Sequence, residues 1–358
     1  MIRMGVIGTG NYGSLHLSAL KDREVNSGDI KLCGFAEIDE GTRKIKEEEF
    51  KCHGYADYHD MIEREKLDAV TIATPDHLHY DITMECLNYN IPLLVEKPFS
   101  TKTSEAEAMI KKAEEANIFL QVDFHKRYDP YHIDLKMRIE DKEAGNLQYG
   151  YLWIEDVLDV GTDMIGKKAW GTGSSPVWFL GIHAIDLSLW LMNFPKPVEV
   201  HAKGFKGKLT SLGLDIYDSI KSTVSYDNGV TITYDTSVIL PNSYEARVHQ
   251  GVKLVGTEGI LELNTQYRGG RYCTPADGMI TPNIGGRYRF YNKNGGISYR
   301  GYLYEAIHDF VDNIHLIKNG RTISEMEGRY PSPAEAILST KIGEAIHQSV
   351  TENRVIPL

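Results

Sequence analysis

Residues 2–13 read Ile2-Arg3-Met4-Gly5-Val6-Ile7-Gly8-Thr9-Gly10-Asn11-Tyr12-Gly13, and this stretch decides the fold of the first part of the chain. The apolar run predicts a buried strand, and the glycines come where a helix is expected to begin. In that context Gly8 permits a tight turn, Gly10 lets the backbone approach a pyrophosphate, and Gly13 allows close packing of helix on sheet. The helix N-terminus favours the phosphate charge. The whole loop, from Gly8 to Gly13, is therefore a predicted dinucleotide site.

An acidic residue ends the next predicted strand. Gly34-Phe35-Ala36-Glu37 places Glu37 24 positions after Gly13, close to the spacing of a ribose partner. A carboxylate there accepts hydrogen bonds from both ribose hydroxyls and repels the 2′-phosphate of NADP, so the expected cofactor is NAD. Asp39 is a nearby alternative for this role. A solvated glutamate at a strand end is the structural alternative.

Two patterns of periodicity divide the chain. Up to residue 122, short β-rich runs alternate with longer amphipathic stretches, which is typical of a parallel sheet with crossover helices. The expected strands are 2–7, 30–36, 68–73, 92–95 and 118–122, and the expected helices include 40–52 and 103–117. Beyond residue 124, the pattern becomes that of an antiparallel α+β domain. Its expected elements are strands in 148–154, 219–226 and 230–238, a turn at Asp227-Asn228-Gly229, helices at 181–193 and 301–319, and loops over 265–300.

The predicted division is a nucleotide-binding domain over 1–123 and a second domain over 124–358. A C-terminal helix at 332–350 is a candidate to pack back on the first domain. Apolar residues are 42% and charged residues 25%, as in ordinary globular domains. The net charge of -11 argues against nucleic acid or an anionic membrane as the main partner. With no signal peptide, no membrane span and scattered cysteines that read as reduced thiols, we expect a cytoplasmic protein.

Two further strands end in polar segments at the carboxyl edge of the predicted sheet, where open α/β folds bind their ligands. The first ends in Thr74-Pro75, whose backbone is expected to line the cofactor groove. His79 follows as a further candidate cofactor contact, or as a residue of a helix start. The second strand ends in Glu96-Lys97-Pro98, where Pro98 prevents the ladder from continuing. We expect Glu96 and Lys97 to contact the cofactor, and Lys97 also to transfer a proton or hold a substrate hydroxyl, with a surface ion pair as the alternative.

Together, the glycine loop, Glu37, Thr74-Pro75 and Glu96-Lys97-Pro98 resemble the glucose-fructose oxidoreductase, inositol dehydrogenase and MocA family over nearly the whole chain. In this resemblance, residues 122–130 correspond to the crossover into a substrate domain, and residues 181–186 to the helix facing the nicotinamide. The resemblance implies a Rossmann domain followed by an α+β domain with a large open, mostly antiparallel sheet. It also implies NAD-dependent oxidation of a secondary hydroxyl on a sugar, glycoside or cyclic polyol.

The resemblance also suggests roles for single residues of the second domain. His183 fits the proton acceptor, with Lys97 as the group that clamps the hydroxyl and stabilises developing alkoxide. Asp186 lies one turn further and would orient the imidazole or contact substrate. His125 is a candidate substrate contact, and Lys126 or Arg127 are candidates to fix the cofactor or an acidic substituent.

One position departs from the family pattern. Many of these dehydrogenases carry an Asp four residues before the histidine, where this chain has Phe179. Phe179 cannot accept a proton, so either His183 and Lys97 suffice or another group, such as Asp156, Asp163 or a tyrosine, takes that role. Phe179 and Trp178 would then be walls that stack on a sugar ring.

Two other functions remain as alternatives. One is glycoside cleavage through transient oxidation by tightly held NAD, and the other is a non-catalytic protein that senses sugar or NAD, as Phe179 suggests. We expect no metal site, because no histidine is spaced with cysteines or carboxylates as metal ligands are. The resemblance implies a homodimer or homotetramer formed through the second-domain sheet. The segment Trp170-Gly171 reads as a loop that covers the substrate, or as a loop without function.

Overall fold

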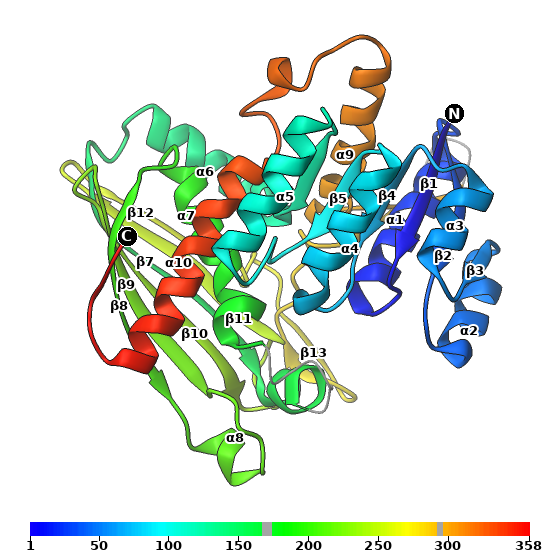
Figure 1. Cartoon of the computed structure of the whole chain (residues 1–358). Helices are drawn as coiled ribbons and strands as arrows, with labels where there is room; N and C mark the ends of the chain where they lie inside the picture. Colours follow the sequence, from blue (N-terminus) through cyan, green and yellow to red (C-terminus); the bar gives the residue numbers. More distant parts are fainter. Residues whose placement is uncertain (167–173, 292–295) are drawn as a thin grey trace. The chain divides into compact units, whose positions relative to one another are not determined.

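The computed structural model describes residues 1–166, 174–291 and 296–358, which form two compact units (Figure 1). The first unit comprises Met1–Ser100, Ser104–Tyr128 and Gly286–Ala336, and the second comprises Thr101–Thr103, Asp129–Gly285 and Ile337–Leu358. The expected boundary at 123/124 lies close to the observed change at 128/129. Residues 286–336 join the first unit, and most of the predicted helix 332–350 lies in the second. The predicted Trp170-Gly171 loop lies outside the described residues.

The first unit is built on a parallel sheet of six strands in the order β3-β2-β1-β4-β5-β6. These strands are β1 Ile2–Ile7, β2 Ile30–Ala36, β3 His53–Tyr55, β4 Ala69–Ile72, β5 Leu93–Glu96 and β6 Leu120–Asp123. Five of them confirm the predicted strands, and β3 was missed because three residues carry too little periodicity. The strand order reverses between β1 and β4, which is the switch point where ligands bind at the carboxyl ends of the strands.

The helices of the first unit are α1 Asn11–Asn26, α2 Glu40–Phe50, α3 Tyr58–Glu65, α4 His79–Cys86, α5 Thr103–Glu115 and α9 Tyr302–Lys318. Helix α9 comes from the C-terminal third of the chain and packs on α1, where the hydroxyls of Tyr304 and Ser18 lie 2.8 Å apart. Its Phe310 stacks on Phe119 with 5.9 Å between ring centroids. Residues 286–336 therefore complete the core of the first unit.

The second unit is built on a sheet of seven strands in the order β12-β11-β7-β10-β9-β8-β17. Only β7 and β10 pair in parallel, and every other neighbouring pair in this sheet of described residues is antiparallel. The predicted hairpin at Asp227-Asn228-Gly229 is confirmed between β9 and β10. The predicted loops over 265–300 are partly wrong, because two short hairpins lie there. The strands of the sheet are β7 Leu147–Val157, β8 Pro197–Phe205, β9 Ser219–Tyr226, β10 Thr231–Leu240, β11 Val248–Gly256, β12 Ile260–Asn264 and β17 Ile356–Pro357. Strands β13 Tyr272–Thr274 and β14 Gly278–Ile280 form a hairpin of the second unit, whereas β15 Tyr288–Tyr291 and β16 Ile297–Arg300 form a hairpin of the first unit.

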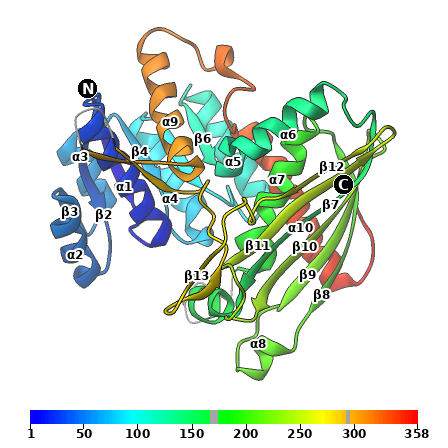
Figure 2. The same ribbon diagram turned by 180° about the vertical axis from the view of Figure 1, so that it is seen from behind.

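Helices cover one face of this second sheet (Figure 1). They are α6 Pro130–Glu140, α7 Ile182–Leu191 and α10 Pro333–Glu352, and a short α8, Lys208–Ser211, precedes β9. Apolar residues from α7, α10 and the inward positions of the strands form one hydrophobic core. The opposite face of the strands is seen in Figure 2 and carries polar and aromatic ladders, such as Trp153 Nε1 donating to His249 Nε2 at 3.2 Å. Among the described residues, no helix of either unit is long and apolar enough to cross a lipid bilayer.

Candidate functional site

The glycine loop has the geometry that a bound pyrophosphate requires. Gly8 has φ +87, and a Cβ there would lie 2.5 Å from the carbonyl oxygen of Ala73. A Cβ on Gly13 would overlap the carbonyl oxygen of Gly8, so α1 can start this close to the loop only with glycine at that position. Gly10, the N-cap of α1, differs because, among the described residues other than its chain neighbours, no atom lies within 4 Å of its Cβ position. The loop is thus held tightly at Gly8 and Gly13 and open at Gly10, which fits the close approach of a phosphate.

Glu37 lies against this loop at the carboxyl end of β2. Its Oε2 accepts hydrogen bonds from the backbone nitrogen of Thr9 at 3.3 Å and from the Thr9 hydroxyl at 2.6 Å. Its Oε1 accepts from the backbone nitrogen of Asp39 at 3.0 Å. The alternative ribose partner, Asp39, is exposed and caps α2 by accepting from the backbone nitrogen of Thr42 at 2.7 Å. The structure therefore brings Glu37, rather than Asp39, to the glycine loop.

His79 connects two loops at the carboxyl edge of the first sheet. Its ring is fully buried, with Nδ1 2.7 Å from the carbonyl oxygen of Pro98 and Nε2 2.9 Å from that of Thr74. Burial lowers the pKa of this histidine. The side chain thus joins the Thr74-Pro75 loop after β4 to the Lys97-Pro98 loop after β5. The contact of His79 with a cofactor stays a prediction.

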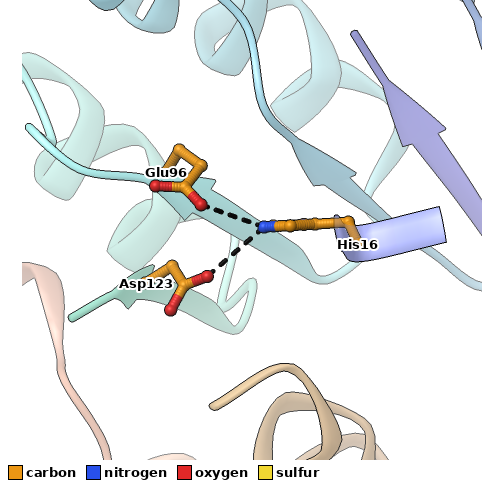
Figure 3. A group of neighbouring side chains, drawn as sticks. All are labelled: His16, Glu96 and Asp123. Atoms are coloured by element: carbon orange, nitrogen blue, oxygen red, sulfur yellow. Dashed lines mark hydrogen bonds and ion pairs between the residues drawn. The ribbon is translucent and has the colours of Figure 1, made fainter. Parts of the chain in front are cut away.

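A buried ionic cluster lies at the ends of β5 and β6 (Figure 3). His16 Nε2 on α1 lies 3.0 Å from Glu96 Oε1 and 3.3 Å from Asp123 Oδ2. Glu96 was predicted as a site residue, whereas His16 and Asp123 were missed. Asp123 could have been found from the sequence, because it follows the predicted strand 118–122 just as Glu96 follows the predicted strand 92–95. The structure shows that the two residues are register partners. In the sequence, no histidine is spaced with carboxylates as metal ligands are, yet the fold brings this histidine together with two carboxylates. The distances between them are typical of hydrogen bonds.

The three groups of this cluster shift one another's pKa. Burial alone would lower the pKa of His16, but its hydrogen bonds with Asp123 and Glu96 outweigh burial and raise it to about 9. Burial and the nearby charge of Asp123 raise the pKa of Glu96. For Asp123, burial acts in the same upward direction, but the hydrogen bonds from His16 and Glu96, together with the charges of His125 and His16, outweigh it and lower the pKa. The cluster is therefore strongly coupled, with the histidine as its cation.

Lys97 is buried and lies beside the glycine loop. Its Nζ is 5.6 Å from the centroid of the Tyr12 ring, which belongs to that loop. The ring of His125 stacks with those of Tyr12, at 6.1 Å between centroids, and Tyr302, at 5.7 Å. Burial lowers the pKa of His125 to about 3, so its imidazole is neutral near pH 7. The structure therefore brings Lys97, Tyr12 and His125 together at one side of the sheet edge.

The two cations after His125 are also buried. Lys126 Nζ lies over the Tyr302 ring, 5.2 Å from its centroid, and Arg127 pairs with Glu335. These partners come from the C-terminal segment of the same unit. Both cations thus make contacts within the fold of the first unit. The sequence suggests only contacts with the cofactor or an acidic substituent.

The predicted residues of the second unit lie on α7 and the turn before it. His183 and Asp186 are buried and three positions apart on α7. Phe179 lies in the π-helical turn Val177–Gly181 and is half-buried, in contact with the hydrophobic core of this unit. Asp156 is buried near the end of β7, and Asp163 lies in the π-helical turn Val160–Gly166.

Trp178, predicted as a wall of the substrate site, packs inside the second unit. It is buried, and its ring stacks on His347 of α10 with 5.0 Å between centroids. The same histidine accepts a hydrogen bond from Ser175 Oγ at 2.7 Å, because its Nδ1 donates to the carbonyl oxygen of Gly343. Trp178, Ser175 and His347 thus attach the start of the α7 region to α10.

Two family models match this chain in succession. Residues 2–124 match the oxidoreductase family with an NAD-binding Rossmann fold, and residues 132–262 match the GFO/IDH/MocA C-terminal domain. The chain is 26% identical to an inositol 2-dehydrogenase of Rubrobacter xylanophilus over 266 residues, which is 73% of this chain and 71% of that protein. It is also 27% identical over 190 residues to the rhizopine catabolism protein MocA of Rhizobium meliloti, which is 53% of this chain and 56% of that protein.

Solved structures show the same fold at lower sequence identity. GenD2 from gentamicin A biosynthesis, in complex with NAD, aligns with a TM-score of 0.81 at 19% identity, covering 100% of this chain and 96% of that one. A scyllo-inositol dehydrogenase from Lactobacillus casei, with bound NAD(H) and scyllo-inositol, aligns with a TM-score of 0.80 at 16% identity, covering 100% and 99%.

Proposed function

This chain belongs to the GFO/IDH/MocA family of oxidoreductases with an NAD-binding Rossmann domain, and we propose that it oxidises a secondary hydroxyl of a sugar, glycoside or cyclic polyol. The observation that carries this proposal is the position of Lys97. Its ammonium group lies over the ring of Tyr12, so the chain's candidate proton-handling lysine is beside its phosphate-binding loop. A cation at this position supports chemistry on a hydroxyl next to a bound nicotinamide.

NAD is the proposed cofactor, and when bound it would supply the nicotinamide that accepts hydride. The open Gly10 position admits the pyrophosphate, and the Glu37 carboxylate is the proposed ribose partner. The remaining proposed contacts are Thr9, Asn11, Tyr12, Thr74, Pro75 and Glu96, with His79 acting through the loops that it joins.

Two residues are proposed to handle the substrate hydroxyl. Lys97 holds the hydroxyl oxygen and stabilises the negative charge that grows on it as the proton leaves. His183 takes the proton, and Asp186 on the same helix orients the imidazole or contacts the substrate. His125, neutral near pH 7, is a further proposed substrate contact through its ring nitrogens. Phe179 would contact an apolar face of the sugar ring.

The substrate class is proposed from the relatives. The Rubrobacter protein is an inositol 2-dehydrogenase, and the Lactobacillus casei structure holds scyllo-inositol beside NAD(H). Cyclic polyols are therefore the first compounds to test, followed by aldoses and methyl glycosides.

The test is NADH formation by the purified full chain with NAD and each compound, with NADP in parallel. Lys97→Ala is expected to lower kcat by at least about a hundredfold, because the charge that stabilises the alkoxide is lost. The matched control is Lys44→Ala, a lysine exposed on α2, which should leave kcat unchanged. No NADH formation across the panel despite tight NAD binding would contradict the proposal.

A second candidate function is a non-catalytic sensor of sugar and NAD. Phe179 supports it, because a half-buried aromatic ring stands where many family members carry an aspartate that can accept a proton. A substrate deuterated at the reacting carbon separates the two functions. Transfer of deuterium to the nicotinamide supports a dehydrogenase, whereas binding of both ligands without transfer supports the sensor.

Self-association through the outer face of the second sheet is a further part of the proposal. Tyr149 on β7 is 55% exposed on this face, and Tyr151 and Trp153 follow it along the strand at alternate positions. Such aromatic surface is typical of interfaces. Light scattering of the full chain, with Tyr149→Glu as the variant, tests for the proposed homodimer or homotetramer.

A further inference from the structure

We propose that His16 is a positioning residue for Lys97: its imidazolium bridges the carboxylates of Glu96 and Asp123 and thereby fixes the end of β5 to the glycine-loop helix α1. The inference rests on the proposed function only for the task of Lys97. The bridge itself is a property of the first unit and can be tested without a substrate.

The geometry places one nitrogen between two carboxylates (Figure 3). His16 Nε2 lies 3.0 Å from Glu96 Oε1 and 3.3 Å from Asp123 Oδ2. Glu96 is 4% exposed and Asp123 2%, and they end neighbouring strands at the same register position. Two adjacent carboxylates in a water-excluded site repel each other strongly unless a cation compensates them or one of them takes up a proton, and the raised pKa of Glu96 reflects this repulsion. His16 is fully buried and lies where a compensating cation acts on both carboxyl groups.

The cluster reaches Lys97 through the second oxygen of Glu96. Glu96 Oε2 accepts a hydrogen bond from the backbone nitrogen of Lys97 at 3.2 Å, while Oε1 faces His16. One carboxylate thus links the imidazole of α1 to the backbone of the lysine.

Helix α1 also contacts the other end of Lys97. Tyr12 and His16 are four positions apart and therefore share one face of the helix. The Tyr12 ring lies 5.6 Å from Lys97 Nζ, and His16 holds the Lys97 backbone through Glu96. The helix whose N-terminus would bind the pyrophosphate therefore positions the lysine at both ends.

The surroundings favour the charged form of His16. The groups that face it are Glu96 from β5 and Asp123 from β6, with Lys97 and His125 next to these carboxylates. The pKa of His16 rises to about 9 and that of His125 falls to about 3, so His16 is the charged histidine of the pair near pH 7. Within the described chain, His16 Nδ1 is buried without a hydrogen-bond partner. No hydrogen bond to a described residue therefore stabilises the proton on Nδ1, and the charged ring depends on the attraction between the imidazolium and the two carboxylates.

The first experiment follows the histidine ring resonances of the full chain by NMR as the pH is raised. His16→Gln assigns the signal, and His201→Gln, at an exposed position of the second unit, is the matched control. We expect one resonance to titrate near pH 9, to vanish in His16→Gln and to persist in the control. A His16 that is neutral near pH 7 would overturn the proposal, as would a stoichiometric metal ion in the purified protein.

A second variant keeps the test decisive if His16→Gln does not fold. Asp123→Asn removes one of the two carboxylates and leaves a side chain of the same size. We expect the His16 pKa to fall by about one unit or more in this variant, because half of the compensating charge is lost. An unchanged His16 titration in Asp123→Asn would show that the bridge does not exist.

A double-mutant cycle then separates positioning from packing. His16→Gln is expected to lower kcat about tenfold with little change in KM for NAD, because Lys97 loses its alignment while the glycine loop remains. Adding Asp123→Asn should restore part of that loss, because it removes a carboxylate left without a cation. Losses that simply add in the double variant, or an unchanged kcat in His16→Gln, would contradict positioning. If no polyol is oxidised, the proposed function fails while the NMR titrations still decide the bridge.

Discussion

The carboxylate of Glu37 accepts two hydrogen bonds from Thr9, one from its backbone nitrogen at 3.3 Å and one from its hydroxyl at 2.6 Å. The acidic residue at the end of β2 is thereby held against the loop that would bind the pyrophosphate. A ribose diol bound there would face a fixed negative charge, which favours NAD and disfavours the 2′-phosphate of NADP.

Glu37→Gln should therefore weaken the preference for NAD. The neutral amide no longer repels a 2′-phosphate, and the ratio of affinities for NAD and NADP is expected to fall by about tenfold or more. Asp39→Asn is the control, because Asp39 caps α2 and lies at the exposed side of the same turn. Binding of both cofactors by titration calorimetry measures the ratio, and an unchanged ratio in Glu37→Gln would refute the assignment of the ribose partner.

Gly10→Ala should separate cofactor binding from folding. Apart from its chain neighbours, no atom of the described part of the chain lies within 4 Å of the Cβ position, so the variant is expected to fold with a free energy of unfolding unchanged within about 0.5 kcal/mol. The methyl group would, however, occupy the space of the phosphate and reduce NAD affinity by about tenfold or more. Gly41→Ala in α2, where the added Cβ makes an ordinary contact, is the control and should bind NAD normally. Normal NAD affinity in Gly10→Ala would place the pyrophosphate elsewhere.

The ionic cluster predicts a pH-dependent stability with a definite sign. The pKa of His16 in the folded protein is raised from 6.5 to about 9, so the folded form holds a proton that the unfolded chain releases. The stabilisation is fully present below pH 6.5 and is lost as the pH rises through about 9. The upper limit of this contribution to the free energy of unfolding is on the order of 3 kcal/mol. Denaturant unfolding should show the free energies of unfolding of wild type and His16→Gln converging as the pH is raised, and a constant difference would contradict the linkage.

Ser175 should stabilise the start of the α7 region. Its hydroxyl donates to His347 Nε2 at 2.7 Å and accepts from the backbone nitrogens of Val177 at 3.1 Å and Trp178 at 3.2 Å. Ser175→Ala is expected to lower the free energy of unfolding by about 1–2 kcal/mol, because it removes a cap and leaves a buried imidazole nitrogen without its donor. Ser211→Ala, at an exposed position of α8, is the control. Equal stability of the two variants would show that the Ser175 contacts contribute nothing measurable.

Local patterns account for most of the predicted elements. The strands around Gly8 and the hairpin at Asp227-Asn228-Gly229 were predictable because strand periodicity and turn chemistry act within a few residues. Strand β3 and the hairpins within 265–300 escaped prediction because runs of three or four residues have almost no period to detect. The sequence also did not predict that residues 286–336 belong to the first unit, because only the packing of α9 on α1 reveals this.

The sequence alone determined the nucleotide-binding loop, since glycine spacing, a preceding strand and an acidic residue after the next strand form one local pattern. It also placed Lys97 at the carboxyl edge of the sheet, because a strand followed by proline must end there. Only the tertiary structure decided that His16, Glu96 and Asp123 meet. They lie 80 and 27 residues apart along the chain and come together because parallel strands align their carboxyl ends beside the helix that follows β1. No spacing in the sequence encodes that contact, which depends on strand order and on the charge balance of a buried site.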